Sequence, residues 1–105
     1  MVKKAEPRLS HATLRILRIL LEHPNDELAG ADIGKVTGIL SGTMYPVLAR
    51  LEQAGWLTSR WETLDPSEAG RPRRRLYHLT GVGSRKAKAA LTELVVTSGR
   101  LVWES

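Results

Sequence analysis

Hydrophobic side chains recur at intervals of three and four residues through the first half of the chain, the spacing of one face of an α-helix. The pattern predicts a helix over residues 11–22 and a short helix over residues 31–37. A third helix is predicted from Ser41, a good N-cap residue, to Gly55, where a left-handed residue would end it. Residues 31–54 are therefore a predicted helix-turn-helix.

The spacing changes to two after the third predicted helix. Hydrophobic and polar residues alternate over residues 56–62 and again over residues 76–79, which predicts two strands. Residues 64–72 between them have the composition of a loop, so the strands would form a hairpin whose tip stands away from the core. Thr80 is suited to cap a last helix that runs to about Trp103.

The third predicted helix has two unlike faces. Its buried stripe is expected to consist of Met44, Val47, Leu48 and Leu51. The opposite face carries small or hydrogen-bonding residues, namely Gly42, Pro46, Ala49 and Gln53, flanked by Thr43, Tyr45 and Arg50. Such a face could approach another surface closely, or it could simply tolerate a packed neighbour. The residues expected to be buried on the two earlier helices are Leu14, Leu17, Leu20, Leu21, Ile33 and Val36.

Length, charge and cysteine content narrow the functional classes. The 105 residues suffice for one domain with a modest core, and the absence of cysteine excludes disulfides and thiolate metal sites. A net charge of +5 and a pI near 10.1 favour a polyanionic partner, although such a charge also serves solubility. The first ten residues lack the apolar core of a secretory signal, and two arginines interrupt the apolar stretch 14–21. We therefore expect no membrane association and a cytoplasmic location.

Four arginines stand close together where the tip of the predicted hairpin is expected, at Arg71, Arg73, Arg74 and Arg75. A guanidinium keeps its charge and donates two hydrogen bonds at once to phosphate oxygens, so the cluster suits a nucleic-acid backbone or a minor groove. The alternative is a solvated turn that serves solubility. The helix-turn-helix directly before the cluster favours the first interpretation.

The third predicted helix is expected to enter the major groove of duplex DNA. The side chains expected to reach the DNA are Ser41, Thr43, Tyr45 and Arg50. The small residues expected to let the backbone lie deep in the groove are Gly42, Pro46 and Ala49. Hydroxyl groups more often bind phosphates, so Arg50 or Thr43 would read bases, and Lys35 would touch the backbone. For Tyr45 the alternative is a half-buried packing residue.

An enzyme or a metal site finds little support. His11, His23 and His78 lie on three separate elements, without acidic partners at ligand or triad spacing. Residues 81–86, GVGSRK, lack the full motif of a phosphate-binding loop and the strand geometry that should precede it. We therefore expect no catalytic residues, no metal and no cofactor.

The last predicted helix carries apolar residues at the spacing of paired helices. The residues expected at a dimer interface are Ile19, Ala87, Leu91, Leu94, Val95 and Leu101. No other predicted element is left to cover this seam, which favours a homodimer. Trp103 would line a cavity for a flat apolar ligand or would simply pack.

Three segments in order carry a family resemblance: ADIGKVTG at 31–38, SGTMYPVLARLEQAGWL at 41–57 and GRPRRRLYHLT at 70–80. With them the chain resembles the PadR family of bacterial transcriptional regulators. The resemblance implies a winged helix-turn-helix homodimer that represses transcription from a palindromic operator and responds to a small aromatic or lipophilic effector. Carried over by position, the implied operator contacts are Ser41, Thr43, Tyr45 and Pro46, with wing contacts at residues 73–75.

The sequence thus predicts an α+β fold that is mainly α, a winged helix-turn-helix over residues 1–80 and a C-terminal dimerisation helix over residues 81–105. The expected function is that of a sequence-specific DNA-binding regulator, a ligand-responsive repressor on a double-stranded operator. Two alternatives are a winged-helix protein-interaction module and an architectural DNA-binding protein without operator preference. A steep fall of DNA affinity with salt would exclude the first, and competition with random duplex tests the second.

Overall fold

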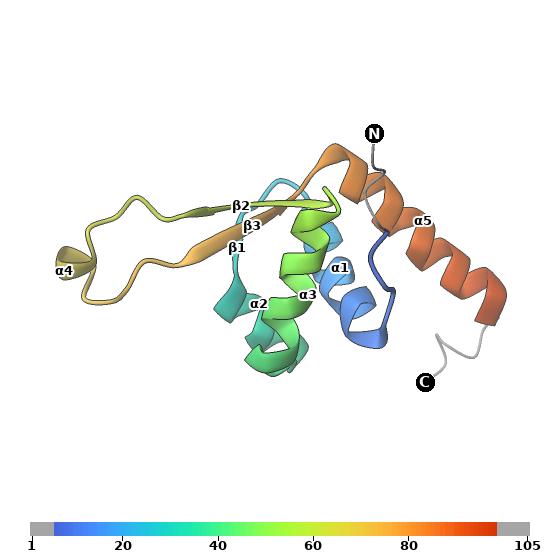
Figure 1. The fold of residues 1–105 in the computed structure, drawn as a ribbon, viewed down its shortest axis with the longest axis horizontal. Helices are drawn as coiled ribbons and strands as arrows, with labels where there is room; N and C mark the ends of the chain where they lie inside the picture. Colours follow the sequence, from blue (N-terminus) through green and yellow to red (C-terminus); the bar gives the residue numbers. More distant parts are fainter. Residues whose placement is uncertain (1–5, 99–105) are drawn as a thin grey trace.

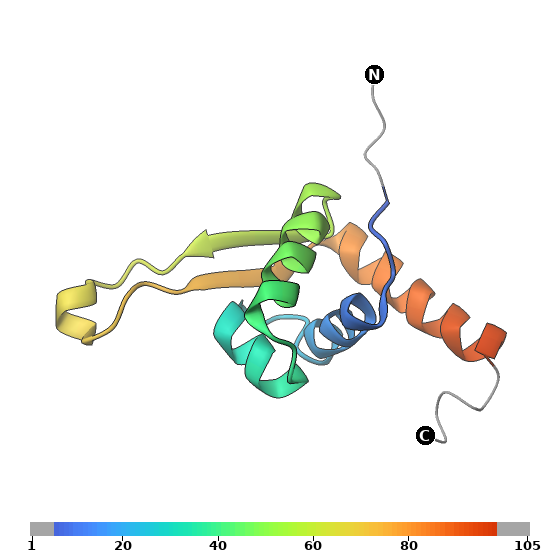
Figure 2. The ribbon, with the colours of Figure 1, turned by 60° about the horizontal axis from the view of Figure 1, so that its bottom comes forward.

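The computed structural model describes the backbone of residues 6–98 and the side chains of residues 6–93. The elements in chain order are α1 (His11–Glu22), β1 (Leu28–Ala29), α2 (Gly30–Thr37), α3 (Ser41–Gln53), β2 (Leu57–Trp61), α4 (Pro66–Ala69), β3 (Arg75–Leu79) and α5 (Gly81–Ser98). Helices α1, α2 and α3 form the body of the molecule (Figure 1). The β2–β3 hairpin projects from one side of the body and α5 from the other, as Figure 2 also shows. The fold is a winged helix-turn-helix, α+β and mainly α, as predicted.

A three-stranded antiparallel sheet of order β1-β3-β2 joins the hairpin to the body. β2 and β3 pair from Leu57 opposite Leu79 to Trp61 opposite Arg75. β1 pairs along the other edge of β3. We call residues 57–79 the wing.

Two short elements were not predicted. β1 lies between the first two predicted helices, where no strand was expected. Two residues are too few to show an alternation, so its pairing with β3 alone defines it. α4 lies in the expected loop over residues 64–72. There Asp65 Oδ1 accepts a hydrogen bond from the backbone N–H of Ser67 at 3.0 Å and caps the turn.

Three predicted helix ends are confirmed. Ser10 Oγ accepts from the backbone N–H of Thr13 at 3.2 Å and caps α1. Thr80 Oγ1 accepts from the backbone N–H of Gly83 at 2.9 Å and holds the first turn of α5. Gly55 has a φ of +84° just beyond α3, a conformation that glycine adopts without steric cost.

The predicted N-cap of α3 is wrong. Leu40 occupies the N-cap position and its side chain makes no capping hydrogen bond, while Ser41 is the first residue of the helix. The carbonyl oxygen of Leu40 already accepts from the backbone N–H groups of Thr43 at 3.0 Å and Met44 at 2.9 Å. The helix therefore starts at Ser41, one residue earlier than a cap at Ser41 would place it.

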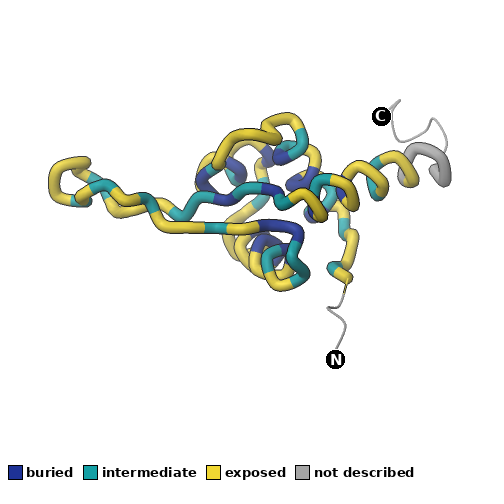
Figure 3. Tube along the Cα trace, turned by 90° about the horizontal axis from the view of Figure 1, so that it is seen from above, coloured by how far each residue is buried: buried dark blue, intermediate teal, exposed yellow. Residues whose placement is uncertain are grey.

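Buried residues gather in the body, whereas the wing beyond its base is exposed or half-buried (Figure 3). The predicted stripe of α3 is confirmed, with buried Met44, Val47, Leu48 and Leu51. The buried residues of α1 are Thr13, Ile16, Leu17 and Leu20. Leu14 and Leu21, expected in this core face, are only half-buried, because α1 is apolar on several sides and spacing alone does not select one. Val36, expected to be buried on α2 beside Ile33, is 67% exposed.

The expectation that α5 lacks a partner within the chain is wrong for its first half, which packs against α1. Ala87 is fully buried in the chain's own core, so it is not available to a dimer interface. A Cβ built on Gly83 would lie 2.0 Å from the carbonyl oxygen of Trp56, so only glycine permits this close approach.

Leu91 is half-buried, and Ile19 is half-buried in a shallow groove between α1 and α2. The other expected interface and effector positions have side chains outside the described residues, namely Leu94, Val95, Leu101 and Trp103.

Candidate nucleic-acid interface

The outer face of α3 is open along the whole helix. The exposed residues on this side are Ser41, Gly42, Thr43, Pro46, Ala49, Arg50 and Gln53. A Cβ built on Gly42 would meet no atom within 4 Å. Pro46 has no N–H, so the carbonyl of Gly42 lacks the hydrogen bond that an α-helix normally supplies. The first two turns of α3 therefore offer an accessible backbone as well as short polar side chains.

Tyr45 combines the two roles considered for it. Its side chain is 42% exposed. Its ring also covers buried Gly30 at the start of α2, since a Cβ on that glycine would lie 2.7 Å from Cε1 and 2.9 Å from the hydroxyl oxygen of Tyr45. The tyrosine thus packs the two helices of the helix-turn-helix together and leaves part of its ring at the surface.

Two cationic side chains of the helix-turn-helix are exposed and have no polar partner among the described residues. Arg50 lies in the last turn of α3 and Lys35 in the last turn of α2. Neither forms a hydrogen bond or an ion pair with any other residue in the part of the chain that the structure describes. Both side chains are therefore able to bind an external anion without breaking an internal contact.

The wing holds its arginines by carboxylates. Arg71 donates to both carboxylate oxygens of Glu62, from Nη1 at 2.7 Å and from Nη2 at 3.2 Å. The backbone N–H of Arg74 donates to the same carboxylate at 2.8 Å. These donors, the Arg71 side chain first, lower the pKa of Glu62 from 4.5 to about 2. Glu62 thus fixes the arm that carries the cationic run.

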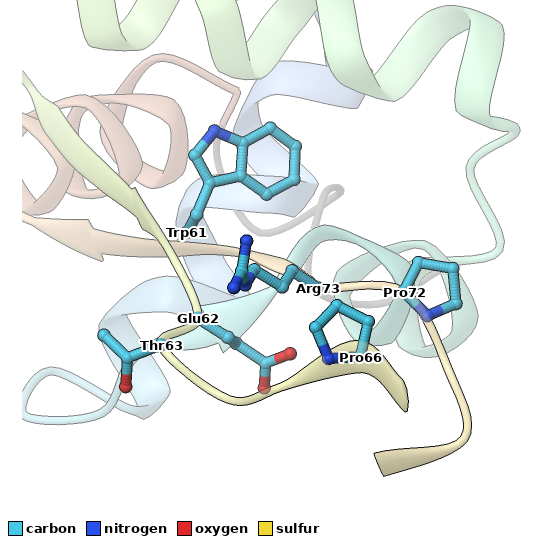
Figure 4. Close-up of a pocket in the computed structure, with 6 residues that line it drawn as sticks. All are labelled: Trp61, Glu62, Thr63, Pro66, Pro72 and Arg73. Atoms are coloured by element: carbon cyan, nitrogen blue, oxygen red, sulfur yellow. The ribbon is translucent and has the colours of Figure 1, made fainter. Parts of the chain in front are cut away.

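Arg73 lies nearer the far end of the wing, in a shallow hollow whose lining residues are Trp61, Glu62, Thr63, Pro66, Pro72 and Arg73. Figure 4 shows its side chain reaching from one arm of the wing toward the other, in the direction of Trp61. Its Nε donates to the carbonyl oxygen of Leu64 at 2.9 Å. The contact leaves the guanidinium at the surface, because Arg73 is exposed.

Arg75 was expected at the hairpin tip, but the structure places it at the start of β3, opposite Trp61 at the outer end of the paired strands. Its Nε donates to Ser59 Oγ at 3.0 Å, and its guanidinium lies 5.1 Å from the ring centroid of Trp61. Its Nη2 lies 3.9 Å from Glu52 of α3, and Ser59 donates to the same carboxylate at 2.7 Å. Arg75 therefore ties the wing to α3.

The tip of the wing lies elsewhere than the arginine cluster. The far end of the wing is α4, which is capped by Asp65, contains Glu68 and has no arginine of its own. The cationic residues follow on the returning arm, and Arg74 Nη1 lies 3.7 Å from Asp32 at the start of α2. The cluster therefore extends along the wing from near α4 to the body.

Neither a metal centre nor a membrane span is apparent in the described part of the chain. There, no three His, Cys, Asp or Glu side chains form a group able to hold a metal ion. None of the described helices combines the length and the apolar character needed to cross a membrane.

A family profile decides the classification of this winged helix. The profile of the transcriptional regulator PadR-like family matches residues 27–89, from the connector before β1 into the first half of α5. The chain belongs to the PadR-like family. This confirms the resemblance carried by the sequence motifs. PadR-like proteins are DNA-binding transcriptional regulators rather than enzymes, which confirms the expected non-enzymatic class.

Solved structures of similar fold include a PadR family transcription regulator from Clostridium difficile R20291 and MepR of Staphylococcus aureus. The first is 22% identical with a TM-score of 0.70, and the match covers 91% of this chain and 100% of that chain. MepR in its DNA-binding conformation is 21% identical with a TM-score of 0.69, over 92% of this chain and 66% of that chain. These likenesses establish the shared fold. No curated protein matches the chain in sequence.

The structure groups the predicted DNA-binding residues of this PadR-like chain on two adjoining surfaces, α3 with Lys35 and the returning arm of the wing. Sequence reasoning did not single out Glu62 or Trp61, although a carboxylate and an aromatic ring beside an arginine run are a usable signal for ion pairing and cation–π contact.

Proposed function

We propose that the protein is a sequence-specific repressor that binds a palindromic DNA operator as a homodimer and responds to a small ligand. The observation that carries the DNA assignment is the open outer face of α3, where Gly42, Pro46 and Ala49 leave the backbone accessible beside a cationic wing. The major groove, about 12 Å wide, admits a helix of this kind. A solved complex of MepR with DNA shares the fold, with a TM-score of 0.65 and 19% identity over 90% of this chain and 72% of that chain, which supports DNA as the partner.

The contacts divide into reading and positioning. Arg50 or Thr43 reads base edges, while Ser41 and the exposed part of Tyr45 bind phosphates. Lys35 and the wing arginines neutralise the DNA backbone. Exposed Arg73 and Arg74 are the principal wing contacts in this proposal. Arg71 and Arg75 are half-buried beside Glu62 and Glu52 and contribute mainly by shaping the wing.

The homodimer forms through the part of α5 beyond Ala87, in the C-terminal region of residues 81–105, while residues 1–80 bind DNA. Two features support this: α5 leaves the body on the side away from the wing, and Leu91 is only half-buried within the chain. The two copies of α3 then enter successive major grooves about 34 Å apart. Because the first half of α5 packs on α1, the division at residue 81 is functional rather than a structural boundary.

Light scattering tests the dimer. Leu91→Asp and Leu94→Asp place a charge in the proposed interface and are expected to convert a dimer into a monomer. Thr92→Asp, at an exposed position of the same helix, is the matched control and should leave the mass unchanged. A parent chain that is monomeric at micromolar concentration contradicts the proposal.

Selection from a random duplex pool tests operator binding. The parent protein is expected to enrich one inverted repeat and to bind it at least 1,000-fold more tightly than random duplex, within the usual range for specific regulators. Affinity should fall steeply between two salt concentrations. Enrichment without a common sequence favours the architectural alternative, and salt-independent or absent DNA binding favours the protein-interaction module.

Repression by a small aromatic or lipophilic effector completes the proposal and is supported by the family resemblance. A regulator with a chromosomal operator acts in the cytoplasm of its cell. Its repressor activity is tested by a reporter gene placed behind the enriched repeat, whose expression should fall when the protein is present. The effector is sought among flat aromatic compounds that restore expression of the reporter. A compound that shifts the tryptophan fluorescence of the parent protein, but not that of Trp103→Phe, would identify the effector region.

A further inference from the structure

Leu40 is an unusual residue for the position it holds. It occupies the N-cap of α3 without a side-chain hydrogen bond to the helix. Its side chain is 80% exposed, the highest value among the large hydrophobic residues that the structure describes as exposed. The chain therefore places an aliphatic side chain in water at the start of the helix proposed to read DNA.

Local stability does not account for this leucine. N-cap positions favour Ser, Thr, Asp and Asn, because their side chains accept hydrogen bonds from the free N–H groups of the first turn, and leucine is among the least favoured residues. A side chain exposed in this way also gains little from hydrophobic burial. Departures of this kind from local preference are expected at functional sites.

The surroundings of Leu40 indicate what it meets. Its carbonyl oxygen accepts from the N–H groups of Thr43 and Met44, so its backbone is fixed to the first turn of α3. It directly precedes exposed Ser41 and the open position at Gly42. In the major groove, the one apolar group that distinguishes a base is the C5-methyl of thymine.

We propose that Leu40 contacts the C5-methyl group of one thymine in each operator half-site and thereby contributes to sequence selectivity. This inference rests on the proposed function and adds a specificity-determining residue to it. The contact is apolar and complements the polar reading assigned to Thr43 and Arg50. It stabilises the complex with the thymine-containing site and does little for binding to phosphates.

Single-position replacement of thymine by deoxyuridine tests the contact, because it removes only the methyl group. The probe is the duplex that the parent protein enriches from a random pool, resynthesised with one thymine per half-site replaced at a time. We expect one position at which the replacement weakens binding about four-fold per half-site, the worth of one buried methyl group. Leu40→Ala should abolish the penalty at that position and leave the effect of replacing every other thymine unchanged.

Two further variants separate recognition from folding. Leu40→Ser supplies an N-cap hydroxyl, so its melting temperature should rise by about 4 °C while the deoxyuridine penalty is lost. Val82→Ser changes another exposed aliphatic residue, in the first turn of α5, and should retain the full penalty. A melting temperature that falls in Leu40→Ser overturns the inference, because the leucine would then serve the fold.

The remaining outcomes are equally decisive. A deoxyuridine penalty that survives in Leu40→Ala, or a duplex without any sensitive thymine, overturns the inference while leaving the proposed function intact. If light scattering shows that Leu40→Ala has lost the dimer while its base selectivity is unchanged, the residue serves a protein contact, and the inference is overturned as well. Failure to enrich any sequence overturns the proposed operator binding itself and is recognised before deoxyuridine is introduced.

Discussion

Helix α3 and the wing are both exposed to a prospective DNA partner, but different forces hold them in place. α3 is fixed from behind by four buried apolar side chains, Met44, Val47, Leu48 and Leu51. The wing has no buried residue between Thr58 and Leu76. The pairing of β2 with β3 joins its arms, and carboxylate–arginine pairs link these arms to each other and to α3. The position of α3 therefore depends on the core, whereas that of the wing depends on strand pairing and charge. Substitution, salt and pH should act on the two regions differently.

The two regions are joined at one place. Glu52, on α3, accepts from Ser59 at 2.7 Å and lies 3.9 Å from Arg75, both in the wing. This link sets the angle of the wing relative to the helix at its base. Farther from α3, Glu62 joins the two arms of the wing by accepting hydrogen bonds from Arg71 and Arg74. The comparison can therefore be tested one region at a time.

The largest effect is expected for the core support of α3. Leu48→Ala removes a fully buried side chain and should lower the free energy of unfolding by about 2–5 kcal/mol, measured by urea denaturation. Gln53→Ala, at an exposed position of the same helix, is the control and should change it by about 0.5 kcal/mol or less. A Leu48→Ala protein as stable as the control would contradict the claim that buried side chains hold α3 in place.

The next effect concerns reading by α3. Arg50→Ala should weaken binding to the enriched operator by about 1–3 kcal/mol and leave binding to random duplex nearly unchanged, because a base contact discriminates between sequences. Fluorescence anisotropy on operator variants measures this difference. Folding stability should stay close to that of the parent, since Arg50 makes no contact that the fold requires among the described residues. Equal losses on both kinds of DNA would reassign Arg50 to the phosphates.

A smaller and more uniform effect is expected from the wing. Arg74→Ala should weaken binding to all duplexes alike and reduce the slope of log affinity against log salt by about one. Asp32→Asn is the matched control, because it removes the carboxylate that lies 3.7 Å from Arg74 and should strengthen binding slightly. An unchanged salt slope in Arg74→Ala would show that its guanidinium does not meet a phosphate.

Local features of these two regions were predictable from the sequence. The stripe of α3 has a regular spacing, and the caps at Ser10 and Thr80 and the left-handed Gly55 depend on neighbouring residues only. The alternation after α3 gave the strand positions, because one face of the hairpin covers the core.

Tertiary placement was not predictable in the same way. Val36 has the helical spacing of a core residue but faces outward, and nothing in a periodic pattern states which apolar side finds a partner. The seam spacing of Ala87 does not distinguish packing on α1 from packing on a second chain. Arg75 could be placed only once the turning point of the wing was known. That point is α4, which Asp65 caps.

The finest test separates the regions by pH. The pKa of Glu62 is lowered to about 2, so the stabilisation it gives the wing is complete above about pH 4.5 and is lost as the pH falls toward 2. The buried stripe of α3 contains no titratable group and should not respond. The amide NMR signal of Arg74, which donates to Glu62, should therefore shift with a midpoint near pH 2, while the amides of Val47 and Leu48 keep their positions. In Glu62→Gln this titration should be absent. A midpoint near 4.5 in the parent would mean that arginine does not hold this carboxylate, and charge would then no longer explain the shape of the wing.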